Sequence, residues 1–318
     1  MTHLSPRALA LLELPREERA LACMRDVFLN YPTAMAVDHS AKRLLASPRN
    51  TSNAGMSLIA LPGLGKSTIG VSWEKRSFDP ASDWPGKIIY LDLVKNSANL
   101  SVMKLFLAAI GERFHTRPLN LSYRDVGLAK TLVREHNVRG VFVDEAPMLR
   151  LALTGAPVNR ELGSIKGLAG HEWQLNVVLA GTPDEMYALF DNDETLKSRF
   201  NIRVGSLSYW KNDDEGRSFI KGYLALMPLE QRSVLNDDFF KILEKNTLTT
   251  TTVRKKLVIY NSRRAVADLT REACRAAVET GQEYVNSEIL VSTVNAMKNV
   301  IEEINLNDYA RPDLGPFA

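Results

Sequence analysis

A short loop rich in small residues constrains the fold of this chain more than any other feature. The apolar run MSLIA at 56–60 is followed by LPGLGKST, which closes on Gly65, Lys66 and Ser67. This spacing matches the phosphate-binding pattern G-x-x-x-x-G-K-[ST], except that Ala60 stands at the first glycine. Backbone N–H groups of such a loop converge on phosphate oxygens, and the following helix adds the positive end of its dipole. The loop therefore predicts a strand, a phosphate site and a helix, in that order.

Each residue type in this loop has a place in nucleotide chemistry. We expect Lys66 to reach the β and γ phosphates and the Ser67 hydroxyl to bind Mg²⁺. The predicted ATP-binding segment comprises Pro62, Gly63, Leu64, Gly65, Lys66, Ser67 and Thr68. The alternative is a simple strand-to-helix turn that carries a solvated lysine on the first helical turn.

A second motif lies downstream and complements the first. The segment RGVFVDE at 139–145 is an apolar run that ends in Asp144 and Glu145. A carboxylate at the end of a buried strand can hold Mg²⁺ through water, and its neighbour can orient or deprotonate an attacking water. By itself the pattern also fits a strand that leaves the core for a solvated turn. With the phosphate loop upstream, it predicts Asp144 at the metal and Glu145 as the catalytic carboxylate.

The composition fits a globular nucleotide-binding protein. A chain of 318 residues is long enough for one large or two smaller domains. No apolar run approaches membrane-spanning length and 1–10 lacks a signal-peptide core, so we expect a cytoplasmic protein with no membrane partner. Cys23 and Cys274 are far apart and indicate neither a disulfide framework nor a zinc site. The net charge of +3 permits an anionic partner without requiring one.

Strand and helix patterns alternate from the loop onward, which is typical of a parallel sheet covered on both faces. The patterns predict strands at 57–61, 87–93, 140–143, 175–180 and 199–207, and helices at 66–76, 101–114, 123–137, 158–170 and 186–190. Upstream, helices are expected at 9–29 and 34–45, followed by a polar loop at 47–55. After Ser208 apolar residues recur only at helical spacing, and TLTTTT at 247–252 predicts a loop or a β-prone turn.

Two polar residues follow the fourth predicted strand. Thr182, in AGTPDE, stands at the carboxyl end of that strand, where it can contact the γ-phosphate or the attacking water. The same residues also fit a turn with a helix cap. Arg199, in LKSRF, stands between a short helix and an edge strand, where a guanidinium can neutralise transition-state charge in a neighbouring subunit. A surface arginine paired with Asp193 or Glu194 is the alternative.

These residues together resemble an AAA+ ATPase, and more narrowly the TniB/TnsC group of transposition regulators. The resemblance runs from 14 to 281 and is carried by the leader LPREERALACMRDVFLNYPTA, the loop LPGLGKST, the strand VFVDEA and the segments VVLAGTPDE and LKSRF. It implies an α/β fold with a P-loop AAA+ parallel sheet covered by helices. The expected parts are an N-terminal helical extension at 1–54, the nucleotide-binding domain at 55–208, a small helical lid domain at 209–304 and a C-terminal tail at 305–318.

The resemblance also implies roles and partners. Lys66 and Ser67 would bind ATP and Mg²⁺, Asp144 and Glu145 would form the Walker B pair, Thr182 would be the sensor, and the finger acting in trans would be Arg199. Proteins of this group assemble on duplex DNA as ATP-dependent rings or filaments, recruit the transposase and link it to a target-selector protein. The implied function is a homo-oligomeric, ATP-dependent regulator of DNA transposition in which ATP hydrolysis drives disassembly.

Further residues are assigned on the same resemblance. Arg264, which precedes a predicted helix together with Arg263, would be the lid-domain residue that contacts ATP, although the glycines expected beside it in this group are missing. A solvated pair at a helix start is the alternative. Lys95 and Lys104 would contact DNA phosphates, whereas basic residues on exposed loops and helix faces are usually just solvated. No base-reading motif occurs, so contacts should go to the DNA backbone with little sequence preference.

Other classes of nucleotide-binding protein stay open to different degrees. A P-loop kinase for a small metabolite would share Lys66, Ser67 and the sheet, but it would need neither Arg199 nor a helical lid. The guanine motif N-K-x-D of GTPases and the LSGGQ-like signature of ABC ATPases are both absent. Another DNA-associated AAA+ loader, or an adaptor whose ATP binding builds a platform with incidental turnover, fits the same residues.

Overall fold

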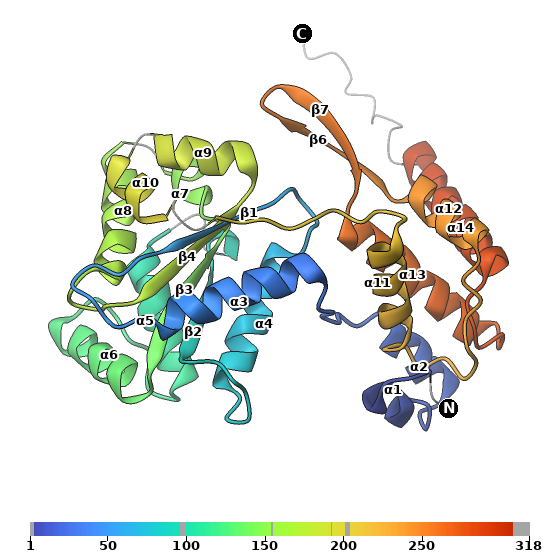
Figure 1. Cartoon of the computed structure of the whole chain (residues 1–318), viewed down its shortest axis with the longest axis horizontal. Helices are drawn as coiled ribbons and strands as arrows, with labels where there is room; N and C mark the ends of the chain where they lie inside the picture. Colours follow the sequence, from blue (N-terminus) through green and yellow to red (C-terminus); the bar gives the residue numbers. More distant parts are fainter. Residues whose placement is uncertain (1–2, 96–99, 154, 192, 201–203, 308–318) are drawn as a thin grey trace, which may run out of the picture. The chain divides into compact units, whose positions relative to one another are not determined.

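The structure is a computed structural model that describes residues 3–95, 100–153, 155–191, 193–200 and 204–307, with side chains as far as 298 (Figure 1). The chain divides into two compact units. The sheet unit comprises Asn30–Ser208 and Thr251–Val258, and the helical unit comprises Met1–Leu29, Tyr209–Thr250 and Ile259–Ala318. The segment expected to form a single extension at 1–54 is therefore divided between the two units after Leu29.

Five parallel strands form the centre of the sheet unit, in the order β2-β3-β4-β1-β5. They are β1 (Met56–Ile59), β2 (Lys87–Asp92), β3 (Val138–Asp144), β4 (Asn176–Gly181) and β5 (Val204–Gly205). Consecutive strands are parallel and therefore need crossover connections, which the intervening helices provide. The register pairs Ile59 with Gly181 and Asp92 with Asp144, so the carboxyl ends of the strands meet at one edge. Ligands of open parallel sheets bind at that edge.

Helices cover both faces of the sheet, because successive strand residues point to opposite sides (Figure 1). On β3, Val141 and Val143 belong to a buried cluster that includes Phe106 of α5. Phe142 between them faces the other way and packs edge-on against Trp73 of α4, with 5.6 Å between ring centroids. The helices of this unit are α3 (Pro32–Ala46), α4 (Lys66–Phe78), α5 (Val102–Arg113), α6 (Tyr123–Glu135), α7 (Met148–Leu151), α8 (Ala156–Ala169), α9 (Pro183–Asp191) and α10 (Glu194–Phe200).

The helical unit joins the beginning of the chain to its C-terminal part. Its helices are α1 (Pro6–Leu11), α2 (Arg16–Cys23), α11 (Asp214–Leu224), α12 (Asp237–Asn246), α13 (Arg263–Glu279) and α14 (Ser287–Asn307). The Arg19 guanidinium on α2 donates two hydrogen bonds to the Glu283 carboxylate, at 2.7 and 2.8 Å, and both side chains are buried. Removing one partner of such a buried pair costs about 3–5 kcal/mol. The leader is thus an integral part of this unit.

Several sequence predictions are corrected by the structure. The helix expected at 9–29 is two helices, because Pro15 cannot continue α1 and instead stands directly before α2. The start of the strand expected at 199–207 is wrong, since Arg199 lies in the last turn of α10; 201–203 lie outside the described residues, and β5 is Val204–Gly205. Helix α14 continues to Asn307, beyond the expected start of the tail at 305.

The polar run at 247–252, expected to form a loop or a β-prone turn, lies mostly in a strand. Strands β6 (Leu248–Val253) and β7 (Lys256–Asn261) form a two-stranded sheet, so the expectation of helices alone after Ser208 is wrong. Arg254 and Lys255 connect the strands with φ angles of 50° and 62°. β-Branched threonines favour a strand, but they give no apolar alternation by which to recognise one. In the described part of the chain, no helix combines the length and apolarity needed to cross a membrane.

Candidate nucleotide-binding site

The predicted phosphate loop lies between β1 and α4, in the order of strand, loop and helix that the sequence predicts. Gly63 and Gly65 have φ angles of 70° and 96°, a region that glycine adopts without steric cost. Gly65 directly precedes α4, which begins at Lys66. Ala60 does not have a positive φ angle, so this position does not need a glycine, and the methyl group of alanine brings no backbone strain. The unusual first residue of the motif is therefore compatible with the loop.

Lys66 folds back over this loop. Its ammonium donates hydrogen bonds to the carbonyl oxygens of Ala60, at 2.9 Å, and Leu61, at 3.3 Å, and the residue is buried. Tyr31 also contacts this loop, since its hydroxyl donates to the Leu64 carbonyl at 3.0 Å. No sequence pattern singles out Tyr31, which lies in the leader immediately before α3. Lys66 and the N-terminus of α4 together provide positive charge where phosphate oxygens would bind.

The carboxylates after β3 lie at the same edge of the sheet. Asp144 is only 2% exposed, and its Oδ1 accepts a hydrogen bond from the Glu145 backbone N–H at 3.0 Å. Its Oδ2 accepts one from the Tyr90 hydroxyl at 2.7 Å. Glu145 has a φ of 51°, which is uncommon for a residue with a side chain. Strained backbone of this kind clusters at functional sites, where surrounding contacts hold it.

The Glu145 carboxyl titrates in an unusual environment. Burial raises its pKa, the Lys66 ammonium opposes this increase, and the negative charges of Asp144, Glu185 and Asp92 add to it. A base near neutral pH is more effective when its pKa is raised in this direction. These interactions bring Lys66, from the loop after β1, and Glu145, from the end of β3, into one electrostatic site.

The residues present fit ATP and Mg²⁺. Two glycines of positive φ leave backbone N–H groups free of steric obstruction, and Lys66 provides the cation for phosphate. Ser67, on the first turn of α4, and the buried Asp144 supply one hydroxyl and one carboxylate. Mg²⁺ in nucleotide sites uses one or two such ligands together with phosphates and waters. No group of three or more metal-binding side chains of the His, Cys, Asp or Glu type occurs among the described residues.

Thr182 follows β4 directly and reaches the same edge. Its hydroxyl donates to the Glu185 carboxylate, and its carbonyl accepts the Met186 backbone N–H at 3.0 Å. These contacts are those of a residue at the start of a helix, here α9. Glu185 is also one of the charges that raise the pKa of Glu145. Thr182 therefore makes a contact at the start of α9 and is linked through Glu185 to the surroundings of Glu145.

Arg199 lies at the opposite edge of the sheet. Its guanidinium donates to the Lys166 carbonyl at 3.3 Å, and its own carbonyl accepts the N–H of Gly55, the residue before β1. The phosphate loop follows β1, so the strand separates Arg199 from Lys66. Asp193, the alternative partner, pairs with Lys166 at 2.5 Å instead. No carboxylate among the described residues forms an ion pair with the half-buried Arg199.

The two neighbouring arginines at the start of α13 have different environments. Arg263 is buried in the helical unit, where it donates to the Glu215 carboxylate at 2.8 Å and lies over the Phe219 ring. Arg264 is exposed. Arg263 thus has a structural partner, and Arg264 is the arginine of the pair that is accessible to a ligand.

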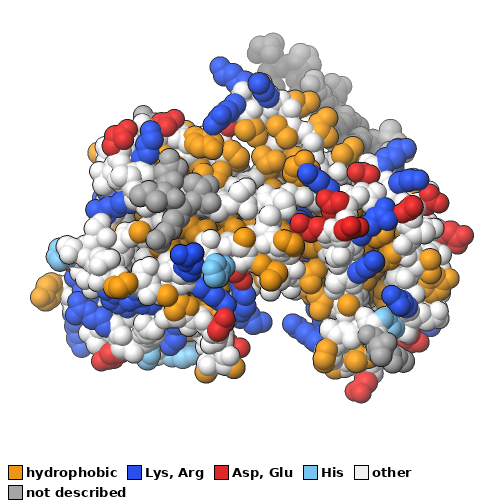
Figure 2. Space-filling view, viewed as in Figure 1, with side chains coloured by type: hydrophobic (Ala, Val, Ile, Leu, Met, Phe, Trp, Pro, Cys, Tyr) orange, Lys and Arg blue, Asp and Glu red, His pale blue; other side chains and the backbone are white. Residues whose placement is uncertain are grey.

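The two lysines expected at DNA are both exposed. Lys95 lies 3.8 Å from the Asp92 carboxylate, and Lys104 lies on the first turn of α5. Asn96, in the same loop, lies outside the described residues. On the face drawn in Figure 2, Lys and Arg side chains are spread over both units and form no single stripe.

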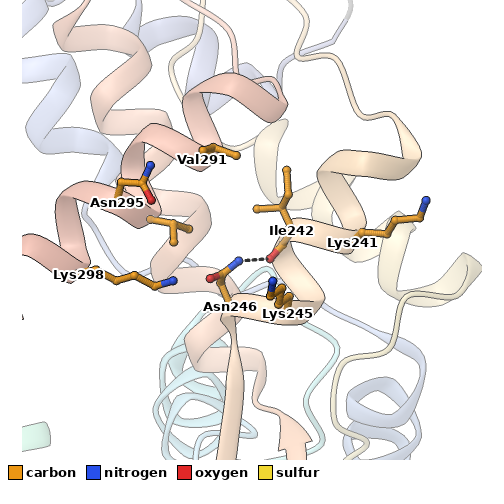
Figure 3. Close-up of a pocket in the computed structure, with 8 residues that line it drawn as sticks. Lys241, Ile242, Lys245, Asn246, Val291, Asn295 and Lys298 are labelled. Atoms are coloured by element: carbon orange, nitrogen blue, oxygen red, sulfur yellow. Dashed lines mark hydrogen bonds between the residues drawn. The ribbon is translucent and has the colours of Figure 1, made fainter.

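A basic groove that the sequence did not indicate lies between α12 and α14 (Figure 3). Its lining combines an apolar floor with lysine and asparagine side chains: Lys241, Ile242, Lys245, Asn246, Val291, Val294, Asn295 and Lys298. Lys241 and Lys245 lie one helical turn apart on α12, and Lys298 lies on α14, far from both in sequence, so no run of charges marked this groove. The groove belongs to the helical unit alone.

Solved structures with a similar fold come from nucleotide-binding proteins. The ORC1 protein of Aeropyrum pernix, solved in complex with DNA, is 16% identical with a TM-score of 0.59, and the match covers 92% of this chain and 77% of that one. The ORC2 protein of the same organism, solved as ADPNP-ADP complexes, is 13% identical with a TM-score of 0.58, and the match covers 86% of this chain and 70% of that one. A Walker-type ATPase of Pyrococcus abyssi is 15% identical with a TM-score of 0.51, and the match covers 90% of this chain and 76% of that one. At these identities the likeness shows the fold.

The fold and the site at the carboxyl edge of its sheet define an AAA+ ATPase. Within that class, the model of the family described as bacterial TniB protein matches residues 19–212, which is more than half of the chain. The chain therefore belongs to the bacterial TniB family. No curated protein matches it at a comparable level.

Proposed function

We propose that this protein is an ATP-dependent regulator of DNA transposition that oligomerises on duplex DNA and links target-site selection to transposase recruitment. Membership of the TniB family supports the link to transposition. The observation that supports the proposal is that the residues proposed for catalysis lie at two opposite edges of one sheet, Glu145 at the carboxyl edge and Arg199 at the amino edge. A site divided in this way is completed by a second copy of the chain, so nucleotide binding and assembly depend on each other.

The nucleotide would be held at the carboxyl edge. ATP with Mg²⁺ supplies a polarised γ-phosphate as the group to be transferred to water. Lys66 exchanges its bonds to the loop carbonyls of Ala60 and Leu61 for phosphate oxygens. Ser67 and Asp144 provide the hydroxyl and the carboxylate for the metal ion. Arg264, exposed on the helical unit, is the proposed lid contact with the nucleotide.

Water activation is assigned to Glu145. Burial and the neighbouring carboxylates raise its pKa, which makes it a better proton acceptor than an exposed glutamate. Thr182 would exchange its hydrogen bond to Glu185 for one to the water or the γ-phosphate. ATP hydrolysis would then remove the contacts that hold neighbouring subunits together and drive disassembly.

Arg199 is proposed to act in the neighbouring subunit. The four residues of β1 separate it from its own phosphate loop, and at roughly 3.3 Å per residue the strand alone spans about 13 Å. An arginine side chain cannot cover this distance to its own γ-phosphate and also keep its contact with Lys166. Placed against the next subunit, the same guanidinium neutralises the charge that develops in the transition state.

Another DNA-associated AAA+ loader or adaptor is the second candidate. It is favoured by the similar fold of the Aeropyrum pernix ORC1 protein, which was solved in complex with DNA. Such a protein would share ATP-dependent assembly on DNA but would not respond to a transposase. A small-molecule kinase, by contrast, would transfer phosphate to an acceptor and would ignore DNA.

Electron microscopy of the purified chain with duplex DNA tests the proposal. Rings or filaments should form on DNA with a non-hydrolysable ATP analogue and should be absent without nucleotide. A sample that stays monomeric with both ligands would contradict it. If Lys95 and Lys104 contact phosphates, their replacement by glutamate should weaken DNA binding without changing ATP affinity. For about 6 phosphate contacts, DNA affinity should also fall roughly 10³-fold between about 50 and 200 mM salt.

A further inference from the structure

Tyr90 lies beside the metal-binding carboxylate and has no role in the mechanism above. It belongs to β2 and is half-buried, and its hydroxyl donates to Asp144 Oδ2 at 2.7 Å. The Ser67 side chain is a second hydrogen-bonding neighbour of the same hydroxyl. One phenol therefore contacts both side chains that would hold Mg²⁺.

The contact with Tyr90 fixes the direction of the Asp144 carboxylate. Oδ2 is held by the tyrosine hydroxyl and Oδ1 by the backbone N–H of Glu145 at 3.0 Å. At 2% exposure, Asp144 has little access to water that could replace either donor. Rotation of the carboxylate would leave a buried acceptor without its donor, which is unfavourable. Asp144 therefore has its orientation before any ligand binds.

The ring of Tyr90 is itself held in place on several sides. It stacks on Phe142 with 5.8 Å between centroids, and its backbone N–H donates to the Glu74 carboxylate at 3.0 Å. Helix α4 approaches so closely that a Cβ on Gly70 would lie 2.8 Å from the Tyr90 ring and 2.7 Å from the Phe142 ring. The hydroxyl is thus delivered to a fixed point by contacts with both β3 and α4.

We propose that Tyr90 is a positioning residue for the metal ion of the nucleotide site, which orients Asp144 toward Ser67. This role rests on the proposed ATP site. A carboxylate that is already oriented loses less conformational freedom when the ion binds, so the hydroxyl strengthens metal-dependent nucleotide binding. The tyrosine does not touch the reacting atoms and acts only through Asp144 and Ser67.

A tyrosine hydroxyl ordinarily keeps its proton near neutral pH. It therefore remains a donor to the carboxylate throughout the range in which ATP binding is measured. Loss of the hydroxyl, rather than its ionisation, is the change that tests the role.

The test replaces Tyr90 by phenylalanine in the full chain and follows binding of a fluorescent, non-hydrolysable ATP analogue. Phenylalanine keeps the ring packed on Phe142 and below Gly70, so the melting temperature without nucleotide should stay within about 4 °C of wild type. Affinity in EDTA should not change. The Mg²⁺ concentration that gives half of the metal-dependent gain in affinity should rise about 10-fold, the effect of losing one hydrogen bond to a charged group.

Tyr223→Phe is the matched control, because Tyr223 is a buried tyrosine of α11 in the helical unit. It should leave the Mg²⁺ titration unchanged. A Tyr90→Phe titration that coincides with that of wild type would assign Tyr90 to packing alone and overturn the proposal. A wild-type chain that shows no Mg²⁺-dependent binding would instead refute the nucleotide site itself.

Discussion

The two edges of the sheet are built differently. At the carboxyl edge, Lys66, Asp144 and Glu145 come from separate strand ends and lie within one electrostatic site, held by hydrogen bonds from their own chain. At the amino edge, Arg199 has only the Lys166 carbonyl as a side-chain partner among the described residues. The side chains of the carboxyl edge are thus held in place by several contacts, whereas the amino edge presents a single half-buried cation.

This difference indicates which parts of the catalytic site one chain can supply. The contacts of the carboxyl edge exist before a ligand arrives, so they need only ATP and Mg²⁺. The cation of the amino edge neutralises no carboxylate in the described part of its own chain, and it lies a strand length away from its own phosphate loop. Substitutions at the first edge should therefore act within a subunit, and those at the second edge should act across an interface.

Replacing Lys66 by alanine should have the most extensive effect, because it removes both ATP binding and the assembly and turnover that depend on it. The variant loses several charge-assisted hydrogen bonds to phosphate, and ATP affinity should fall by at least about 100-fold. Assembly on DNA should be lost with it. Lys75→Ala, at an exposed position on the same helix, is the control and should bind as wild type. Equilibrium binding and electron microscopy measure both effects, and ATP-dependent oligomers of Lys66→Ala would refute the site.

Arg199→Ala should reduce ATP turnover by about 10³-fold, the lower range for a finger arginine, while leaving ATP binding intact. Arg124→Ala, an exposed arginine on α6, is the control. The comparison of edges is sharpened by mixing Arg199→Ala with Glu145→Gln. Each variant lacks a different half of the site, so mixed oligomers should recover part of the turnover. A mixture as inactive as its components would place Arg199 in its own subunit.

Glu145→Gln should slow turnover by about 100-fold, because glutamine cannot accept the proton of the attacking water. ATP binding should persist, so the assembled state should accumulate on DNA. Glu135→Gln, exposed at the end of α6, should have no effect on either property. Steady-state phosphate release measures the rate, and an unchanged rate would remove Glu145 from its catalytic role.

The sequence predicts the central fold well because the parallel strands are buried and strongly apolar. The strand that ends in Asp144 and the helix that begins at Lys66 start and end close to their expected positions. The hairpin at 248–261 was missed because its threonines carry no apolar pattern. The division of the leader could not be predicted either, since the ion pair of Arg19 with Glu283 joins residues far apart in the chain.

Prediction of the site was limited in a similar way. Motif spacing predicts a site that contains Lys66 and Asp144, because loop and strand-end patterns are local in sequence. The contact of Tyr90 with Asp144 arises from the pairing of β2 with β3, and single-sequence patterns carry no information on such pairing. The environment of Arg199 also depends on chain packing, which brings α10 beside α8. Side-chain partners across the fold are thus the part that needs a structure.

The pH dependence of Glu145 gives the smallest expected effect and tests the carboxyl edge on its own. Burial and three nearby carboxylates raise its pKa above the ordinary value of 4.5, against the opposing charge of Lys66. Turnover should therefore fall on the acid side at a higher pH than an exposed glutamate would give, since the protonated group cannot act as a base. This acid limb, with a slope of about one proton, should be absent from the residual rate of Glu145→Gln.

The same shift makes a prediction about stability that needs no nucleotide. Between the ordinary and the raised pKa, the folded chain binds more protons at Glu145 than the unfolded chain does, so stability should decrease as pH rises through this window. Below this pH window Glu145 is neutral in both states and does not lower the free energy of unfolding. Above the window it is charged in both states, and its burial lowers the free energy of unfolding by the full amount. The melting temperature of Glu145→Gln should thus rise relative to wild type by a few degrees over the window, as expected for about 1 kcal/mol. If the melting temperatures of the two proteins instead changed in parallel with pH, burial would not raise the pKa of Glu145. The proposal that its pKa suits it to act as the base would then be refuted.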